Sequence, residues 1–291
     1  MSGSHRAVSP NTHNRRRRAI NRVVIAITYL FAALTTVPLL AILFYLLVRG
    51  ASSLSFGFLV HAPKPAGETG GGMGNALVGS VILLVIAALV GLPVGVGAGL
   101  RLAERPRTTL SNTVRFLADV LNGLPSIVMG IFAWQLLVRP MHHFSALAGG
   151  IALGVMMIPM VARTTEEMLR LVPVSLREAA LALGYTRWRT SITVVLRTAT
   201  GGIVTGALVA IARVAGETAP LLFTAFGNQF WSLSLARPIA ALPLQIFNYA
   251  IAPYDDWNAQ AWAGAIVLLA FVFVISVAPR VATRRRHDSA D

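Results

Sequence analysis

The 291-residue sequence contains no cysteine, which excludes disulfides, thiolate metal sites and thiol nucleophiles. Its single lysine, Lys64, lies between Pro63 and Pro65. A Walker-type phosphate loop requires a lysine after glycine and before serine or threonine, so the sequence holds no ATP site of that type. Charged residues make up only 12% of the chain, whereas soluble domains carry about a quarter. These absences argue against a soluble enzyme or an ATPase.

Most of what is present is apolar. Hydrophobic residues make up 55% of the chain, and several apolar runs reach about 20 residues, enough to cross roughly 30 Å of hydrocarbon as a helix. We therefore expect an all-α integral membrane protein with six transmembrane helices. The expected spans are 23–48, 76–100, 116–138, 146–162, 202–226 and 260–279.

These spans define the expected domain organisation. Residues 1–22 form a basic tail, and residues 23–74 hold the first membrane helix and an outer segment. A transmembrane domain covers 75–280, with its longest loop at 163–200, and residues 281–291 form a second tail. The first apolar run is too long for a signal peptide, so we expect it to be retained as a span.

The positive charge indicates the orientation. The net charge is +14, but the basic residues flank apolar runs, which points to membrane topology rather than to nucleic acid. Twenty of the 25 lysines and arginines fall on the side of the two termini and four on the other side. By the positive-inside rule, both termini are predicted to be cytoplasmic in a multi-pass plasma (inner) membrane protein.

Small residues recur at four-residue spacing within the expected spans. This spacing places glycines on one face of a helix and lets two backbones approach closely. It predicts tight helix packing, and a sliding seam used in gating is the alternative. The residues are Gly91, Gly95 and Gly99, then Gly150 and Gly154, and Gly202 and Gly206.

The loop at 163–200 reads as an ordered cytoplasmic elbow. Ser175 followed by Glu178 predicts a capping box at the start of a helix. Gly184 suits the left-handed position that ends it, and a second helix, basic on one face, is expected over 185–197. A flexible tether would join two spans more simply, so a rigid elbow indicates a docking surface.

The elbow carries a recognisable motif. Glu178, Ala179, Ala180 and Gly184, followed by Val194 and Leu196, resemble the EAA loop of type I ABC-importer permeases. Where the family pattern usually has proline, this chain has Arg197, which is similar to the phosphate-permease branch. The strings at 163–173 and 210–224 also resemble that branch, and the likeness covers about residues 70–280.

The resemblance implies a MetI-like fold and a non-catalytic subunit without cofactor or metal. It implies that Glu178, Ala179, Ala180, Gly184 and Leu196 couple the chain to an ATPase. It further implies four kinds of partner: a similar but distinct permease subunit, two cytosolic ATP-binding subunits, an extracytoplasmic phosphate-binding protein and membrane lipid. Nucleic acid is not among them.

A buried charge indicates the substrate pathway. Arg213 lies near the middle of the fifth expected span, where an arginine costs about 2.5–3.5 kcal/mol on insertion scales. Glu217 is expected one helical turn further on the same face, and Thr218 is a candidate hydroxyl donor. A guanidinium matches phosphate oxygens in a bidentate manner, and a carboxylate could recognise the proton of hydrogen phosphate. Mutual neutralisation of the two charges within one helix is the simpler interpretation.

These observations predict the permease subunit of an ATP-driven importer of inorganic phosphate. The same architecture could carry another oxyanion, such as sulfate, molybdate or phosphonate. A stand-alone anion transporter would show inverted repeats with paired broken helices, and the sequence shows no convincing repeat. A membrane hydrolase would need a nucleophile and base, which the spans do not offer.

Overall fold

The computed structural model describes residues 12–68 and 70–288, and the chain divides into two units, residues 1–49 and 50–291. The first unit is essentially one helix, α1 (Thr12–Gly50), which contains Pro38. Part of the predicted basic tail, residues 1–11, lies outside the described residues. The remainder of that tail is already helical and runs directly into the first span.

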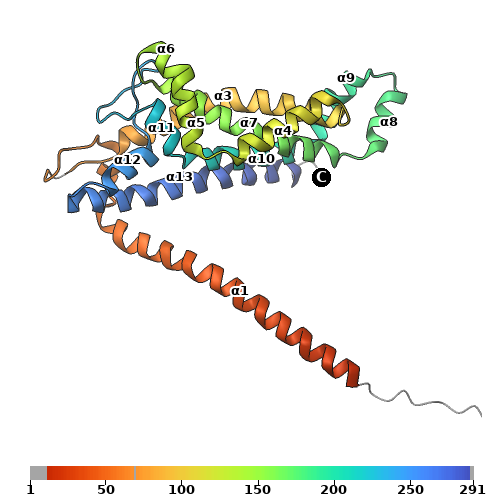
Figure 1. The fold of residues 1–291 in the computed structure, drawn as a ribbon, viewed down its shortest axis with the longest axis horizontal. Helices are drawn as coiled ribbons and strands as arrows, with labels where there is room; N and C mark the ends of the chain where they lie inside the picture. The colour runs from red at the N-terminus through yellow and green to blue at the C-terminus, as the bar shows by residue number, and fades with distance from the viewer. Residues whose placement is uncertain (1–11, 69, 289–291) are drawn as a thin grey trace, which may run out of the picture. The chain divides into compact units, whose positions relative to one another are not determined.

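The second unit is helical apart from its connecting segments (Figure 1). Short 3-10 or π turns at Ala51–Ser53, Trp134–Val138 and Ser191–Val195 join some of its helices. The helices are α2 (Phe56–Val60), α3 (Gly74–Glu104), α4 (Thr109–Gly123), α5 (Ser126–Ala133), α6 (Arg139–Met141), α7 (Ala146–Arg170), α8 (Val174–Ala182), α9 (Arg187–Thr190), α10 (Leu196–Ala215), α11 (Ala219–Thr224), α12 (Leu242–Ala250) and α13 (Asp255–Asp288).

Five described helical segments are long and apolar enough to cross a membrane. A sixth span results if the pair formed by residues 109–123 and 126–141, bent by 106°, is counted as one. The all-α, six-span prediction is therefore confirmed for the described part of the chain, although the third span is broken rather than straight.

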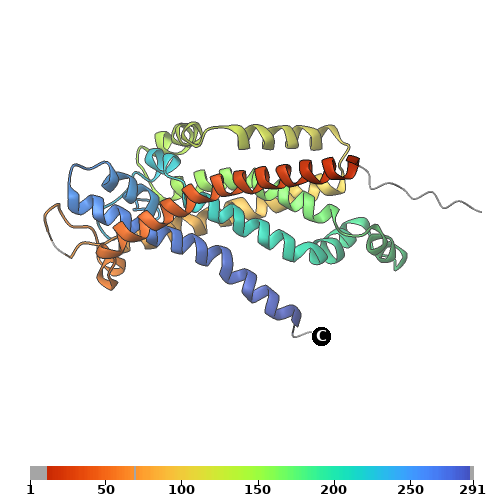
Figure 2. The same cartoon turned by 90° about the horizontal axis from the view of Figure 1, so that it is seen from below.

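Helices α3 and α7 form the centre of the bundle and lie side by side (Figures 1 and 2). Gly91, Gly95 and Gly99 of α3 face Met157, Val161 and Thr165 of α7, one turn apart along the seam. A Cβ atom at Gly99 would lie 2.6 Å from the Ala162 carbonyl oxygen, so only glycine fits there. The predicted packing role of these glycines is confirmed.

Helix α10 packs on α7 by the same means. Gly202 lies against the Met168 side chain and Gly206 against Thr164, so no larger residue fits either position without rearrangement. Close approach of backbones is the usual way in which membrane helices associate, because lipid supplies no hydrophobic driving force between them.

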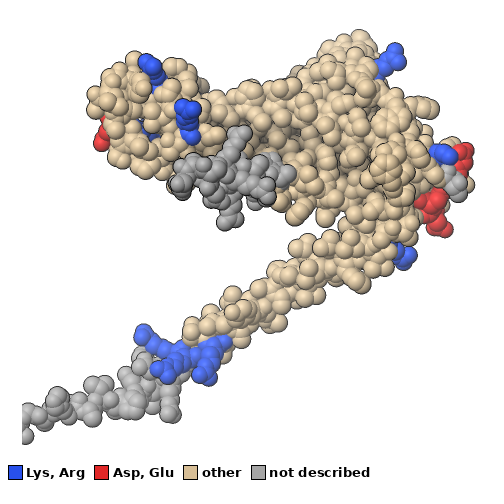
Figure 3. Space-filling view, turned by 180° about the vertical axis from the view of Figure 1, so that it is seen from behind, with Lys and Arg blue, Asp and Glu red and all other residues tan. Residues whose placement is uncertain are grey.

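The two ends of the second unit differ in charge. We call the end that carries α8, α9 and the end of α3 the basic end. Figure 3 shows one face on which Lys, Arg, Asp and Glu gather toward the ends and leave the middle uncharged. Helices α6, α11 and α12 lie at the opposite end (Figure 1). The exposed or half-buried arginines of the basic end include Arg101, Arg105, Arg107, Arg177, Arg187 and Arg189.

Two predicted spans are interrupted. The third, expected at 116–138, breaks after Gly123 because Leu124 adopts an extended conformation (φ −73°, ψ 137°) before Pro125. The fifth, expected at 202–226, starts at Arg187 and ends at Ala215. Pro220 has no backbone N–H to donate, and its ring would clash with the helical carbonyl group four residues earlier. The helix therefore does not continue through it, and a new helix, α11, starts at Ala219.

The predicted loop at 163–200 is also shorter than expected. Helix α7 continues to Arg170, and the helix that begins at Arg187 runs without interruption into the fifth span. Only residues 171–186 connect the two. Good helix formers and an i,i+4 ion pair between Arg163 and Glu167 (3.5 Å) extend α7 beyond its apolar stretch.

Candidate functional site

The breaks in the third and fifth spans lie beside one cavity of about 130 Å³. Met156 and Met160, from the middle of α7, form part of its wall, so the cavity lies at mid-span depth. Irregular backbone at membrane depth is tolerated where it lines a polar cavity rather than lipid. The cavity is lined by Leu121, Asn122, Leu124, Ser126, Met156, Met160, Arg213, Val214 and Glu217.

Arg213 occupies the last turn of α10 and is exposed in this chain. Its side chain makes no hydrogen bond or ion pair with any other described residue. An arginine is always charged, so at mid-span depth it must meet water, a ligand or a polar group of another chain. The structure therefore places a free guanidinium fork at the cavity.

Glu217 does not sit where the sequence predicted. It was expected one helical turn after Arg213 on the same face, but α10 ends at Ala215. The Glu217 backbone N–H still donates to the Val214 carbonyl at 3.2 Å, and its half-buried side chain lines the cavity. No ion pair joins Arg213 and Glu217 among the described residues, so neutralisation within one helix is wrong.

Thr218 is half-buried at the start of α11 and is not among the residues that line the cavity. Its carbonyl accepts hydrogen bonds from Leu221 and Leu222 at 3.1 and 3.2 Å. The sequence had not suggested Asn122 and Ser126, which bring an amide and a hydroxyl to the cavity. The signal that could have found them is Pro125, which breaks the span between them.

The second region of interest is the elbow formed by α8 and α9. Gly184 has φ +83°, a left-handed conformation, directly after the end of α8, as predicted. The predicted capping box is wrong, because α8 begins at Val174 after Pro173 and has no side-chain cap. Proline fixes the backbone before the first turn, so Ser175 already lies inside the helix.

The motif residues fall into two groups. Glu178, Ala179 and Gly184 are exposed on the elbow. Ala180 is 4% exposed, and Leu196 is half-buried against a cluster that includes Leu169 and Val172. The first group is free to meet a partner, while the second holds the elbow against the bundle.

The elbow presents apolar side chains that no described residue covers. Several exposed large apolar side chains on one short segment indicate a site of protein interaction. The exposed residues are Leu171, Val174, Leu176, Leu181 and Leu183, and the exposed fraction reaches 80% at Leu183.

One arginine ties α8 to two other helices. The Arg177 guanidinium lies 2.7 Å from the Glu104 carboxylate at the end of α3. It also donates to the Leu169 carbonyl of α7 at 3.0 Å. Movement of α8 would therefore be passed to the central α3–α7 pair. Arg177 was not singled out from the sequence, because its partner lies 73 residues away.

A further buried ion pair joins α4 to α7. The Glu166 side chain is 2% exposed and accepts two hydrogen bonds from Arg115, at 3.0 and 2.7 Å, and one from Arg170. Arg115 also donates to the carbonyls of Pro106 and Leu102. This cluster fixes the first half of the broken third span against α7.

Among the described residues, no group of three or more His, Cys, Asp or Glu side chains is placed to hold a metal ion. A bundle with two interrupted spans beside an arginine, and with a helical elbow at its basic end, has the form of a transport permease.

Comparison with known proteins agrees with that class. Residues 91–288 match the family model described as "Binding-protein-dependent transport system inner membrane component". The PstA phosphate transport system permease protein of Yersinia pestis is 43% identical over 273 residues, which cover 93% of this chain and 92% of that protein. The corresponding protein of Xylella fastidiosa (strain Temecula1) is 45% identical over 270 residues, which cover 91% of this chain and 93% of that protein.

The fold is similar to that of a solved transporter. A chain of the methionine ABC transporter MetNI in an inward-facing conformation covers 73% of this chain and 96% of its own length, with a TM-score of 0.59 and 20% identity. The chain is thus a multi-pass inner-membrane permease of the ABC-importer class. Within that class it belongs to the family of PstA phosphate transport permeases.

Proposed function

We propose that this chain is the permease subunit of an ATP-driven importer of inorganic phosphate and forms half of the translocation pathway. The observation that carries the proposal is the unpaired Arg213 guanidinium beside a mid-span cavity. The names of the relatives, which are phosphate transport permeases, supply the substrate.

The chemistry of the cavity suits hydrogen phosphate. The planar guanidinium can donate two parallel hydrogen bonds to two phosphate oxygens. Asn122 and Ser126 add neutral donors, and Glu217 offers an acceptor for the proton that phosphate carries and sulfate lacks at neutral pH. Glu217 also limits how tightly the anion is held, since an anion that binds must leave again. Thr218, next to Glu217, is the remaining candidate for this pathway.

Arg213 is exposed in the isolated chain, so a single copy does not enclose the pathway. A charge exposed at mid-span depth is costly against lipid. The proposal therefore places a second, similar but distinct permease subunit against this surface, with the anion passing between the two.

The basic end is proposed to face the cytoplasm, with both termini on that side, because arginines accumulate there. The two ATP-binding subunits bind on that side, and the elbow meets them through the exposed Glu178, Ala179 and Gly184, while Ala180 and Leu196 hold it in place against the bundle. An extracytoplasmic phosphate-binding protein delivers its cargo at the opposite end. The chain contributes no catalytic residue, and ATP hydrolysis belongs to its partners.

Coupling then follows from the contacts of the elbow. When the ATP-binding subunits close, they displace α8, and Arg177 passes that displacement to Glu104 of α3 and to the end of α7. Helix α7 carries Met156 and Met160 at the cavity, so the displacement reaches the pathway.

The test is uptake of labelled phosphate by the complete transporter in proteoliposomes, with sulfate as competitor. Arg213→Gln is expected to reduce uptake about 10- to 100-fold, because one charged bidentate contact contributes about 1.5–3 kcal/mol. Arg213→Lys keeps the charge but not the bidentate guanidinium, so its phosphate uptake should fall between that of the wild type and that of Arg213→Gln. The matched control is Arg237→Gln, which makes the same charge change at an exposed position outside the cavity.

Unchanged uptake in Arg213→Gln would contradict the pathway proposal. Equal competition by sulfate in the wild type would favour a general oxyanion permease instead. Glu217→Gln is expected to reduce the preference for phosphate over sulfate, and an unaltered preference would rule out the role given to Glu217.

A further inference from the structure

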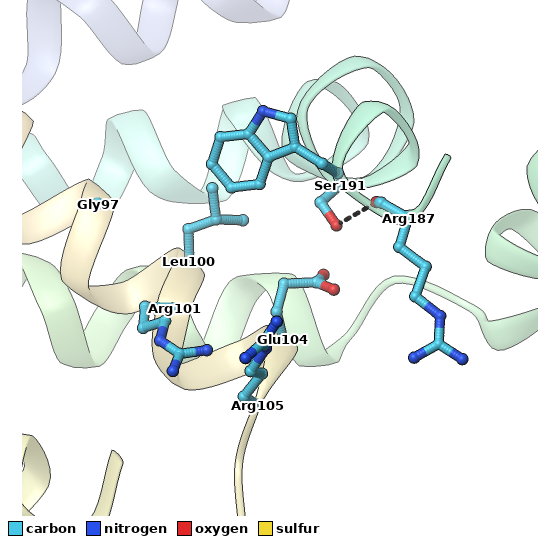
Figure 4. A pocket seen from close by; sticks show the side chains of 8 residues that line it. Gly97, Leu100, Arg101, Glu104, Arg105, Arg187 and Ser191 are labelled. Carbon is cyan, nitrogen blue, oxygen red and sulfur yellow. Dashed lines mark hydrogen bonds between the residues drawn. The ribbon is translucent and has the colours of Figure 1, made fainter. Parts of the chain in front are cut away.

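A second cavity, of about 480 Å³, lies at the basic end between the end of α3 and α9. None of its lining residues belongs to the Arg213 cavity or to the elbow motif. Figure 4 shows Arg101, Glu104 and Arg105 at the end of α3, with Arg187 and Ser191 on the facing helix. The lining residues are Gly97, Leu100, Arg101, Glu104, Arg105, Arg187, Trp188 and Ser191.

The cavity has an excess of positive charge that the described residues do not neutralise. The one acidic residue of its wall, Glu104, is already paired with Arg177 at 2.7 Å. The side chains of Arg101, Arg105 and Arg187 make no hydrogen bond or ion pair with other described residues. Three unpaired guanidiniums around one hollow attract an anion, and phosphate oxygens suit their geometry.

Apart from Ser191, whose hydroxyl donates to the Arg187 carbonyl, the remainder of the wall is apolar. Leu100 is buried in the wall, Trp188 is 67% exposed, and a Cβ atom added at Gly97 would meet nothing within 4 Å. One turn further along α3, Val94 is 52% exposed. Tryptophan favours the headgroup layer of a membrane, and basic pockets between membrane helices hold anionic headgroups.

We propose that this cavity binds a phosphate-bearing anion. Its apolar floor accommodates acyl chains and so favours an anionic phospholipid over free inorganic phosphate. The phosphodiester lies between Arg101, Arg105 and Arg187, and the acyl chains follow the surface of α3 past Gly97. A lipid held there lies beside Glu104, the residue to which Arg177 anchors the elbow.

The experiment uses the complete purified transporter, stripped of lipid in detergent and titrated separately with phosphatidylglycerol and phosphatidylethanolamine. Bound lipid is counted by native mass spectrometry. A second arm measures equilibrium binding of labelled inorganic phosphate in an Arg213→Gln background, which removes the pathway site from the signal.

Three variants probe the cavity. Combined Arg101→Gln, Arg105→Gln and Arg187→Gln removes the charge, and loss of binding by about 100-fold is expected because each basic residue near an anionic surface contributes about fivefold. Gly97→Leu fills the apolar floor without changing charge, so it should exclude the lipid but leave room for inorganic phosphate. Arg107→Gln, an exposed arginine of the same segment that does not line the cavity, is the matched control.

Preferential binding of phosphatidylglycerol that both the triple variant and Gly97→Leu abolish would support the lipid. Binding of inorganic phosphate that only the triple variant abolishes would support the anion site with a soluble ligand. If the triple variant does not assemble, Arg187→Gln alone should weaken binding about fivefold. Binding of both probes that is insensitive to all of these changes would overturn the proposal.

Discussion

The buried ion pair between Arg115 and Glu166 provides a quantitative test of how the broken third span is held. A double-mutant cycle with Arg115→Gln, Glu166→Gln and both together isolates the energy of the pair. The Glu166 side chain is 2% exposed and that of Arg115 is 19% exposed, so solvent screens the pair weakly.

The expected magnitude follows from the contacts. Arg115→Gln leaves Glu166 buried with only Arg170, whose side chain is 52% exposed, as a charged partner. Removing one member of a buried pair costs about 3–5 kcal/mol. Glu166→Gln keeps a hydrogen-bond acceptor for Arg115, so it should reduce the free energy of unfolding by less than Arg115→Gln does. The coupling energy of the cycle is expected at about 1.5–3 kcal/mol, the value of hydrogen bonds to charged groups.

The measurement is denaturant unfolding of the purified chain in detergent micelles. The control cycle uses Arg163 and Glu167 on α7, whose side chains are 49% and 59% exposed and whose closest charged atoms lie 3.5 Å apart. That pair should couple by about 0.5 kcal/mol or less. A coupling energy for Arg115 and Glu166 no larger than that of the control would refute the view that this pair anchors α4 to α7.

Three further predictions concern packing, backbone conformation and pH. Gly99→Ala should destabilise the chain, because its Cβ would lie 2.6 Å from the Ala162 carbonyl oxygen, whereas Gly201→Ala, where nothing lies within 4 Å, should be neutral or stabilising in the same unfolding assay. Gly184→Ala should lower the free energy of unfolding by about 1–2 kcal/mol, because alanine disfavours the left-handed conformation. Co-purification with the ATP-binding subunits should also decrease, and equal recovery would count against a rigid elbow. Burial, reinforced by the Asp256 carboxylate, raises the pKa of Tyr249 above 10.0. The folded state of the protein therefore favours the neutral phenol of Tyr249. This contribution to stability is complete below about pH 10 and is lost as the pH rises further. Tyr249→Phe should remove this alkaline loss of stability when unfolding midpoints are compared across pH.

The apolar runs and the glycine spacing were sufficient to predict the membrane bundle. Four-residue glycine repeats need only the helical period to place them on one face, and Gly91, Gly95 and Gly99 do meet α7. Gly184 was likewise predictable, because few residues other than glycine end a helix in the left-handed conformation. These features depend on short-range geometry, which the sequence records directly.

The breaks in the third and fifth spans were harder to predict, because proline in a membrane helix produces a kink in one context and a break in another. Pro38, Pro93 and Pro159 all lie inside continuous helices, whereas Pro125 and Pro220 accompany breaks. Hydropathy cannot distinguish these cases, since both halves of a broken span remain apolar.

Contacts between distant segments were not accessible from the sequence at all. Arg115 meets Glu166 across 51 positions, and Arg177 meets Glu104 across 73. No local period relates such residues. The i,i+4 spacing of Arg213 and Glu217 was misleading for the opposite reason, because it assumed a helix that ends between them.

The central claim is that Arg213 faces an aqueous path that phosphate enters, and the absence of cysteine from this chain allows a direct test. Arg213→Cys in the assembled transporter, with partner cysteines removed, should react with a charged, membrane-impermeant thiol reagent, and phosphate should slow that reaction. Leu89→Cys, at a 71% exposed apolar position of α3 that lines neither of the two cavities, is the comparison. If Arg213→Cys is as unreactive as Leu89→Cys, the guanidinium does not line the pathway.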